Sequence, residues 1–195
     1  VGEDFKFGKN KSGNAELLQK TGKEFGFKAI ILNTILRKKD KISSSYLRKL
    51  AIDGYIEELN LLRGSNLTFS GHVLHGKKLG RKLGFPTLNI SVPNNHCMSG
   101  IYIASVNGLD SMNDQKSFPA IASLGRRPTI ENCGKLILEV YVLDWSKSVY
   151  GKLVTTKLHK KIRDEIKFKE LSDMREQMII DEIDTRKFFE INEKY

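Results

Sequence analysis

Residues 76–89 read Gly76-Lys-Lys-Leu-Gly80-Arg-Lys-Leu-Gly84-Phe-Pro-Thr87-Leu-Asn89. Three glycines recur at every fourth residue, with four basic side chains between them. Glycine lets a backbone approach a ligand closely, and successive N–H groups in such a loop can bind an anion. Thr87 and Asn89 add oxygen donors that suit Mg²⁺ beside phosphate oxygens. The stretch therefore predicts a site for a polyphosphate and its magnesium, although a solvated surface loop can have the same composition.

The end of this stretch also predicts the start of a strand. Pro86 fixes its own φ and biases Phe85 toward an extended conformation. Because side chains alternate along a strand, Thr87 and Asn89 would then lie on the same face. The pattern thus presents a hydroxyl and an amide oxygen side by side, directly after the glycine loop.

Beyond Ser65-Asn66 the chain changes to short runs of alternating hydrophobicity, separated by Gly, Asn and Pro. Several short strands with turn signals between them predict an antiparallel barrel. A helix is expected at the end of the chain, where apolar residues recur at helical spacing. The expected strands cover 67–73, 101–106, 120–124, 136–143 and 152–159, and the apolar helix positions are Leu171, Met174, Met178, Ile179 and Ile183.

Residues 1–64 follow a different pattern, strand, helix, strand, helix, which is typical of an α/β layer. Residues 28–36 are rich in Ile and Leu and predict a buried parallel strand. The expected fold is therefore α+β. A partial α/β Rossmann-like fragment occupies 1–64, and a barrel domain with a C-terminal helix occupies 65–195.

The strand at 136–143 carries a carboxylate on an apolar face. Glu139 has Ile137 two residues before it and Tyr141 two residues after it. A carboxylate with such neighbours is costly unless it has a partner or a function, and a general base is one such function. The alternative is an exposed position on an edge strand, where a glutamate costs little.

Length and cysteine content limit the class of protein. The 195 residues suit one complete domain and part of a second. We find no apolar run long enough to span a membrane and no signal-peptide pattern. Cys97 and Cys133 are too few for a disulfide framework and lack partners at zinc-ligand spacing. We expect reduced thiols in a cytoplasmic protein.

The net charge of +10 comes from 33 basic and 23 acidic residues. A positive field favours anionic ligands. The excess is spread along the chain, as in a solubilising surface, and no helix-turn-helix, zinc-finger or RNP motif occurs. We therefore expect neither nucleic acid nor a membrane as a partner.

The pattern G-x₃-G-x₃-G-F-P-T-x-N of residues 76–89 resembles the nucleotide loop of riboflavin kinases. Other motifs of that family follow in the same order. They are Ser99-Gly100-Ile101-Tyr102, Leu124-Gly125-Arg126-Arg127-Pro128-Thr129, Leu138-Glu139-Val140-Tyr141-Val142-Leu143-Asp144, Tyr150-Gly151 and Ile162-Arg163-Asp164-Glu165-Ile166-Lys167-Phe168. So many ordered matches are far more specific than any single motif. The resemblance covers about residues 67–190 and implies a six-stranded Greek-key barrel.

The resemblance also implies a reaction, transfer of the γ-phosphoryl of ATP to the 5′-hydroxyl of riboflavin, which gives FMN for FAD biosynthesis. Glu139 matches the catalytic glutamate that accepts the hydroxyl proton. Thr87 and Asn89 match the residues that hold Mg²⁺, and Arg163 and Phe168 match a loop that closes on the flavin ring. The residues implied to bind ATP are His75, Gly76, Lys78, Gly80, Arg81, Gly84, Pro86 and Thr87.

The first residues, Val1-Gly2-Glu3-Asp4-Phe5-Lys6-Phe7-Gly8, resemble a strand and loop of FMN adenylyltransferases, the domain that accompanies this kinase in bacterial bifunctional FAD synthetases. Ile42-Ser43-Ser44-Ser45-Tyr46-Leu47-Arg48 resembles a motif that grips the triphosphate of ATP. The resemblance makes Ser43, Ser44 and Arg48 the remnant of a nucleotide site, whereas from the residues alone they are ordinary helix caps. The usual H-x-G-H motif does not occur in this sequence. We therefore expect no adenylyl transfer from this chain.

The leading hypothesis is thus a riboflavin kinase that binds riboflavin and ATP. A second is a fragment of a complete bifunctional FAD synthetase. A third is a basic barrel that binds nucleic acid without catalysis, but its candidate stacking residues Phe69, Tyr102 and Tyr141 are not clustered with Lys or Arg. One role stays open from the residues alone, because Arg163 could equally form a surface salt bridge with a neighbouring acid, Asp164 or Glu165.

Overall fold

The chain consists of two compact units, Val1–Tyr46 and Leu47–Tyr195, and each is considered by itself. This computed structural model describes residues 1–37, 40–76, 79–93, 98–110, 115–126 and 136–192. Lys78, Cys97, Cys133 and the Arg127-Pro128-Thr129 part of the family motif lie outside the described residues.

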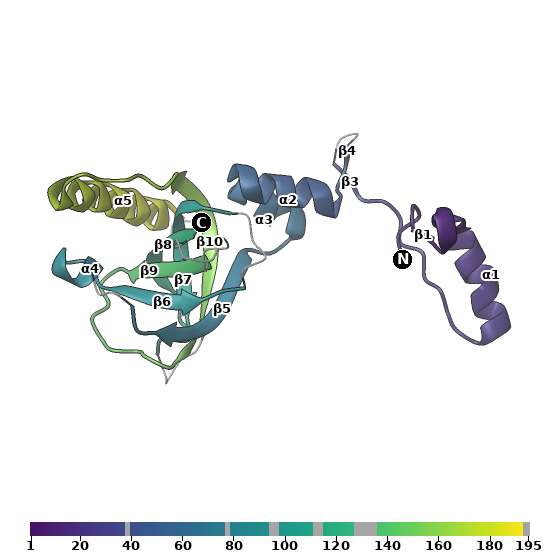
Figure 1. Cartoon of the computed structure of the whole chain (residues 1–195), viewed down its shortest axis with the longest axis horizontal. Helices are drawn as coiled ribbons and strands as arrows, with labels where there is room; N and C mark the ends of the chain where they lie inside the picture. Colours follow the sequence, from purple (N-terminus) through teal and green to yellow (C-terminus); the bar gives the residue numbers. More distant parts are fainter. Residues whose placement is uncertain (38–39, 77–78, 94–97, 111–114, 127–135, 193–195) are drawn as a thin grey trace. The chain divides into compact units, whose positions relative to one another are not determined.

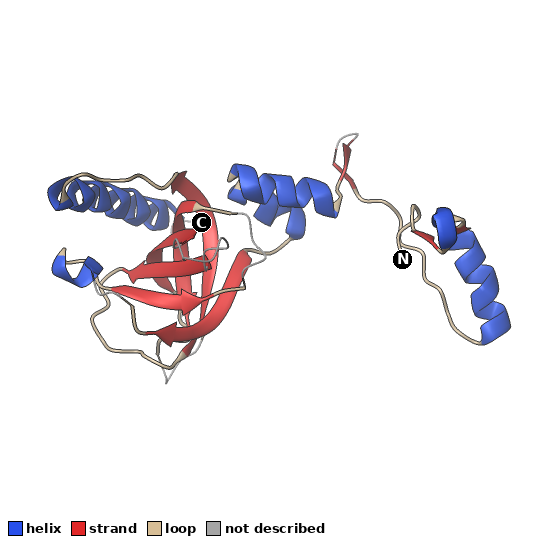
Figure 2. Cartoon of the chain, in the orientation of Figure 1, coloured by secondary structure: helices blue, strands red, loops and turns tan. Residues whose placement is uncertain are grey.

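The second unit is built around a closed barrel of six antiparallel strands (Figures 1 and 2). The strands are β5 (Leu67–Leu74), β6 (Thr87–Ser91), β7 (Gly100–Asn107), β8 (Phe118–Arg126), β9 (Leu136–Val142) and β10 (Leu153–Arg163). They follow the order β10-β5-β6-β9-β8-β7, and β7 pairs with β10 to close the ring. The predicted six-stranded antiparallel barrel is therefore confirmed.

Strand residues alternate between the interior of the barrel and its outer face. In β9, Leu136, Leu138 and Val140 are fully buried, whereas Glu139 and Tyr141 on the other face are only partly buried. This confirms the predicted division of the strand into two faces. Apolar side chains fill the interior of a small barrel, so the outer face is where polar groups can meet a ligand.

The helix α5 (Leu171–Asn192) lies across one side of the barrel (Figure 1). Arg163, the last residue of β10, forms a salt bridge with Asp181 of this helix. Further along, the rings of Phe188 and Phe189 pack on His159 of β10, with ring centroids 5.9 and 5.6 Å apart. The predicted C-terminal helix is thus confirmed, and two separate contacts with β10 hold it on the outer face.

Two more helices, α2 (Ser44–Asp53) and α3 (Ile56–Arg63), precede the barrel. Asn60 joins α3 to two strands, because its Nδ2 donates to the Leu158 carbonyl at 2.8 Å and its Oδ1 accepts from the Leu67 N–H at 2.7 Å. The helix α3 therefore packs with the second compact unit. The domain boundary expected between residues 64 and 65 stays a prediction.

The N-terminal unit has the helix α1 (Ala15–Phe25) and very short strands. These strands are β1 (Lys6–Phe7), β2 (Gly13–Asn14), β3 (Leu36–Arg37) and β4 (Asp40–Lys41), and η1 (Lys9–Lys11) is a 3₁₀ turn. The remaining short helix, α4 (Leu79–Lys82), belongs to the second unit.

The buried parallel strand predicted at 28–36 does not form. Within the described residues it has one parallel bridge, from Leu32 to Gly2, and Ile30 and Leu32 are exposed. A parallel strand is buried only between neighbouring strands and covering helices, so the Rossmann-like fragment has weak support.

His159 forms the contact between β10 and the end of α5. Its Nε2 lies 2.9 Å from the Ser105 hydroxyl, and its Nδ1 lies 3.4 Å from the Asn66 side-chain nitrogen. Burial, with a smaller contribution from the charge of Lys157, lowers the pKa of His159 below its ordinary value. The folded protein therefore favours the neutral imidazole at this position.

We predict a pH dependence of stability that comes from this histidine. In the unfolded chain its pKa is 6.5, so below that pH the unfolded state binds a proton that the folded state resists. Stability should fall as the pH decreases through about 6.5, and this group should contribute almost no slope more than about one pH unit above it. Thermal unfolding followed by circular dichroism from about pH 7.5 to about pH 5 would measure the slope.

The variant His159→Gln should have a shallower slope in that range than the unchanged protein. His72→Gln is the matched control, because His72 is an exposed histidine whose ring nitrogen Nδ1 lies 2.9 Å from the Gly151 carbonyl oxygen. An identical slope in the unchanged protein and in His159→Gln would show that other groups cause the dependence.

Candidate active site

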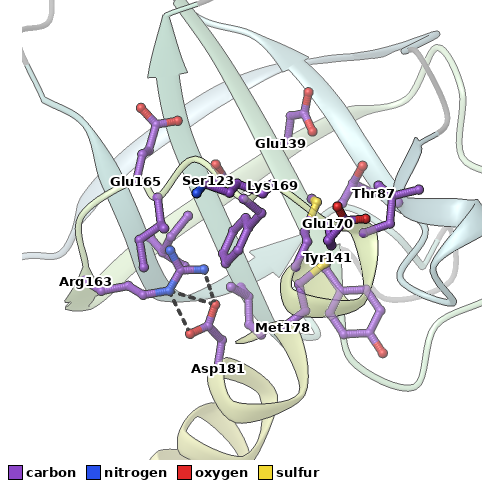
Figure 3. Close-up of a pocket in the computed structure, with 17 residues that line it drawn as sticks. Thr87, Ser123, Glu139, Tyr141, Arg163, Glu165, Lys169, Glu170, Met178 and Asp181 are labelled. Atoms are coloured by element: carbon purple, nitrogen blue, oxygen red, sulfur yellow. Dashed lines mark hydrogen bonds and ion pairs between the residues drawn. The ribbon is translucent and has the colours of Figure 1, made fainter. Parts of the chain in front are cut away.

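A cavity of about 440 Å³ lies on the outer face of the barrel, under the first half of α5 (Figure 3). Its size falls within the range of about 300–1,000 Å³ that is usual for ligand pockets. Five of the six strands supply lining residues, and the rest come from α4, from the segment between β10 and α5, and from α5 itself. The lining residues include Gly80, Thr87, Ile121, Ser123, Glu139, Tyr141, Arg163, Glu165, Phe168, Leu171, Met174, Met178 and Asp181.

The strand register brings the predicted site residues together. Asn89 of β6 lies directly opposite Glu139 of β9, which in turn lies opposite Ser123 of β8. Thr87 lies opposite Tyr141 in the adjacent row. Directly opposed residues in an antiparallel pair have Cβ atoms about 4.5–5.5 Å apart. Of the two residues expected to hold the metal, Asn89 therefore lies directly opposite Glu139, and Thr87 lies diagonally from it.

Both charged and apolar side chains line the cavity. Figure 3 shows Glu139 and Glu165 along one edge, apart from each other, and Met178 toward the opposite edge, beside the Arg163–Asp181 pair. The apolar positions predicted for the last helix fall into two groups. Leu171, Met174 and Met178 line the cavity, whereas Ile179 and Ile183 are exposed to solvent.

Two glycines of the 76–89 stretch make room for their neighbours. A β-carbon at Gly76 would overlap the side chain of Asn89, and one at Gly80 would overlap the Phe85 carbonyl oxygen. The N–H of Phe85 donates to the Gly80 carbonyl at 2.8 Å, and Gly84 has a φ of +90°. The stretch therefore folds back tightly after α4 and delivers Thr87 to the start of β6.

A second, smaller cavity of about 80 Å³ lies next to the first. It is lined by Arg81, Pro86 and Thr87 from the glycine stretch and by Trp145 and Tyr150 from the segment after β9. Thr87 thus lines both cavities. The predicted ATP residue His75 stacks on Tyr150, with ring centroids 3.9 Å apart. Of the predicted ATP residues, Gly80, Arg81, Pro86 and Thr87 line one cavity or the other.

Arg163 and Phe168, the residues expected to contact a flavin, both line the large cavity. The Arg163 guanidinium donates to Asp181 through Nε at 3.0 Å and through Nη2 at 2.7 Å, and its Nη1 donates to the Asp164 carbonyl at 3.0 Å. Its central carbon lies 6.0 Å from the centre of the Phe168 ring. Its salt bridge is therefore with the buried Asp181 and not with either neighbouring carboxylate.

Sequence reasoning missed Asp181. It follows Met174 and Met178 at helical spacing, so it continues the face of α5 that lines the cavity. A carboxylate on an otherwise apolar helix face was the signal that could have identified it. Gln177 Nε2 also donates to Asp181 Oδ1 at 3.1 Å, which completes the partners of this buried group.

A second polar network, also absent from the sequence reasoning, links α5 to the end of β9. Arg186 donates to both oxygens of Asp144 at 2.9 and 2.7 Å and to Glu182 at 2.8 Å. The Tyr141 hydroxyl donates to Glu182 at 3.4 Å. Burial, followed by the nearby charge of Glu182, raises the pKa of Tyr141, which keeps this cavity residue a neutral donor.

Glu165 is a further carboxylate of the cavity lining, at the same edge as Glu139. Burial is the main factor that raises its pKa, the charge of Glu139 raises it further, and Arg163 acts in the opposite direction. A β-carbon at Gly125 would overlap the Glu165 carboxyl group. Gly125 thus leaves the space that this carboxylate occupies.

The residues present fit a divalent cation held mainly by neutral oxygens. Within the described residues no group of three or more His, Cys, Asp or Glu could hold a metal ion. Thr87 and Asn89 instead offer a hydroxyl and an amide oxygen on one face of β6, next to Glu139. Such a donor set suits Mg²⁺, which takes few protein ligands together with substrate phosphate oxygens.

Ser43, Ser44 and Arg48 lie at the start of α2. The Ser43 hydroxyl accepts a hydrogen bond from the Tyr46 N–H at 3.2 Å, as a helix cap does. Their role as a remnant nucleotide site stays a prediction. Across the part of the chain that the structure describes, none of the helices has the length and apolarity needed to cross a membrane.

Family models match both parts of the chain. One that is described as riboflavin kinase matches residues 63–189, and one that is described as FAD synthetase matches residues 1–46. A crystal structure described as a macrolide-efflux protein from Streptococcus pneumoniae has a TM-score of 0.77 and 31% identity to this chain. The match covers 95% of this chain and 58% of that one.

Curated relatives agree with the family models. The bifunctional riboflavin kinase/FMN adenylyltransferase of Escherichia coli (strain K12) is 36% identical over 190 residues, which cover 97% of this chain and 59% of that protein. The protein of the same name from Haemophilus influenzae is 35% identical, with 97% and 60% covered. This chain therefore spans about three fifths of the length of these relatives. On the riboflavin kinase match, which covers more than half of its residues, the chain belongs to the riboflavin kinase family.

Proposed function

We propose that this chain is a riboflavin kinase that transfers the γ-phosphoryl group of ATP to the 5′-hydroxyl of riboflavin, giving FMN and ADP. One observation carries the proposal. In a chain of this family, the strand register sets Glu139 directly beside Asn89, with Thr87 in the adjacent row, at the wall of a cavity large enough for a flavin. The arrangement brings a base and oxygen ligands to one point, as phosphoryl transfer requires.

Glu139 acts as the general base in this proposal. Its carboxylate accepts the proton of the 5′-hydroxyl as the hydroxyl oxygen bonds to the γ-phosphorus. The bond between that phosphorus and the bridging oxygen breaks, and ADP leaves with this electron pair. Glu139 lies at one edge of the cavity, apart from Met178, so the reacting hydroxyl would reach it while the flavin ring lies against the methionines of α5.

Thr87 and Asn89 hold the divalent cation, for which we propose Mg²⁺. When bound, this ion would neutralise charge on the β- and γ-phosphates. Thr87 lines both cavities, so it lies where the two meet. Asn89 is held in place because its side chain packs over Gly76.

The glycine stretch supplies the nucleotide site. His75, Gly76, Lys78, Gly80, Arg81, Gly84, Pro86 and Thr87 are its proposed residues. Phosphates would lie along its backbone and basic side chains. Because the small cavity beside Arg81 shares Thr87 with the large one, a nucleotide there would approach the flavin across a single side chain.

The large cavity takes the flavin ring, with α5 as its cover. Tyr141, Met174 and Met178 offer an apolar and aromatic surface, which suits a planar ring system. Arg163 and Phe168 lie at the same cavity, where Asp181 neutralises the guanidinium. A neutralised cation is a suitable neighbour for an uncharged ring.

A second candidate function is supported by the FAD synthetase match at residues 1–46. In that case the chain would be part of a bifunctional protein that also adenylylates FMN, with Ser43, Ser44 and Arg48 in the nucleotide site. We propose kinase activity alone for the 195 residues, because the H-x-G-H motif is not among them. A cytoplasmic location and reduced cysteines belong to the same proposal.

One assay tests both candidates. The purified chain incubated with riboflavin, ATP and Mg²⁺ should produce FMN and no FAD, as measured by chromatography of the flavins. Omission of the enzyme is the control. FAD formed above that control would support the bifunctional alternative, and folded protein that forms no FMN would contradict the kinase.

We predict that Glu139→Gln lowers kcat by about 10²–10⁴-fold, the usual contribution of a positioned acid–base group. Glutamine keeps the shape and one acceptor oxygen but cannot take the proton, so binding of riboflavin and ATP should be largely retained. Steady-state kinetics and flavin titration would measure the two effects. Glu176→Gln is the matched control, since Glu176 is an exposed carboxylate on α5. Turnover of Glu139→Gln within a few-fold of the unchanged enzyme would remove Glu139 from the base role.

We predict that Thr87→Ala and Asn89→Ala abolish turnover with little loss of thermal stability, because each removes an oxygen ligand of the cation and leaves the barrel interior intact. Ser91→Ala is the matched control, since Ser91 is the next residue on the same face of β6 and is exposed. Turnover and melting temperature should be measured for each variant. Near-normal turnover in both alanine variants would contradict the metal assignment, and unfolding would indicate that both residues only stabilise the strand.

A further inference from the structure

We infer that Glu165 is a substrate-positioning residue, which accepts hydrogen bonds from the ribityl hydroxyls of riboflavin while Glu139 acts on the terminal one. The inference rests on the proposed kinase function and deepens it, because it assigns the polyol part of the substrate to a residue of this chain. Glu165 comes from the segment between β10 and α5, far in sequence from the other carboxylate.

Gly125 in the barrel wall leaves space for the carboxylate of Glu165, an exposed residue of the segment after β10. The three atoms nearest to a β-carbon at Gly125 all belong to the Glu165 carboxyl group, with Cδ at 2.7 Å and Oε2 at 2.9 Å. A side chain at position 125 would therefore displace this carboxylate. Gly125 has no positive φ, so its backbone conformation does not require glycine. What requires glycine here is the close approach of the Glu165 carboxyl group.

The same strand relates Glu165 to Glu139. Ser123 of β8 lies opposite Glu139, and Gly125 follows two residues later on the same face. Two such residues are about 7 Å apart along a strand. The Glu165 carboxylate thus lies over β8, two residues along that strand from the partner of Glu139. The proposed metal ligands lie on β6, the other strand that pairs with β9.

This geometry matches the parts of riboflavin. The ribityl chain joins the ring to the reacting hydroxyl and carries several neighbouring hydroxyls. In the cavity it would pass three polar groups of the lining, Ser123, Glu139 and Glu165. An ionised carboxylate has two acceptor oxygens, so it can accept from two neighbouring hydroxyls at once, and such charge-assisted bonds are strong.

The electrostatic surroundings agree with this role. The charge of Glu139 raises the pKa of Glu165, so the two carboxylates share one region, and Arg163 opposes the increase. Two neighbouring negative groups disfavour an anion between them and favour neutral donors such as hydroxyls. The uncharged ribityl chain satisfies that requirement.

The test compares two flavins. Riboflavin carries the ribityl chain, and lumiflavin has the same ring with a methyl group in its place. With Mg²⁺ and ADP present, quenching of flavin fluorescence gives the Kd of each. Glu165→Ala should weaken riboflavin binding by about tenfold to a hundredfold, as expected for loss of hydrogen bonds to a charged group. Lumiflavin binding should change less than about twofold.

Gly125→Ala provides an independent variant. Because the added β-carbon displaces the Glu165 carboxylate, it should reproduce the riboflavin-specific loss. The double variant should bind riboflavin no more weakly than Glu165→Ala alone, since residues that act through one contact are not additive. Asp164→Asn is the matched control, because it removes a neighbouring, highly exposed carboxylate that pairs with Lys161 and does not line the cavity.

Each outcome decides one point. If the unchanged protein binds riboflavin and Glu165→Ala binds it with the same Kd, the inference is overturned, but the proposed kinase function is not affected. Equal weakening of riboflavin and lumiflavin would overturn the contact with the polyol. Additive losses in the double variant would show that Gly125 does not act through Glu165. If the unchanged protein binds neither flavin, the proposed function itself fails, and the inference fails with it.

Discussion

The buried ion pair between Arg163 and Asp181 is the interaction on which the site depends. It joins the last barrel strand to α5 through two short hydrogen bonds, and both side chains are largely shielded from water. Removing one partner of a buried pair leaves an uncompensated charge and typically costs about 3–5 kcal/mol. Without this pair the first half of α5 would lose its fixed position over the barrel, and the cavity would lose the wall that Met174 and Met178 form. The aromatic contact at His159 and the Arg186 network hold the rest of the helix.

In the closed barrel, the side chains that stabilise the fold are different from those that can contact a ligand. Because strand side chains alternate, one set fills the interior and the other is free to serve a ligand. In β9 the interior set is aliphatic, while Glu139 and Tyr141 of the outer set face the cavity. Pairing with strands on both sides fixes the register of β9, so Glu139 is held against β6 and β8 by backbone hydrogen bonds. A carboxylate positioned in this way needs little reorganisation, which suits the base role proposed for Glu139.

The barrel, the C-terminal helix and the two faces of β9 could be predicted because their signals are local and periodic. The glycine stretch and Glu139 could be singled out for the same reason. Asp181 and the pairing of Gly125 with Glu165 could not, because each depends on a contact between segments that only the fold brings together. Residues 28–36 were misjudged since a run of Ile and Leu indicates burial but not the strands that must supply it. Arg163 lines the cavity, and its partner Asp181 lies 18 residues further along the chain, a contact that sequence neighbours do not indicate.

Thr87 has a consequence beyond its own hydroxyl, because it is a wall of both the large and the small cavity. A ligand that shifts or immobilises this residue in one cavity alters the surface that the other cavity presents. Occupancy of the two cavities is then linked, and thermodynamics requires that each ligand change the affinity of the other by the same factor. If the proposed substrates occupy the two cavities, binding of one would change the affinity for the other through a single threonine at the start of a strand.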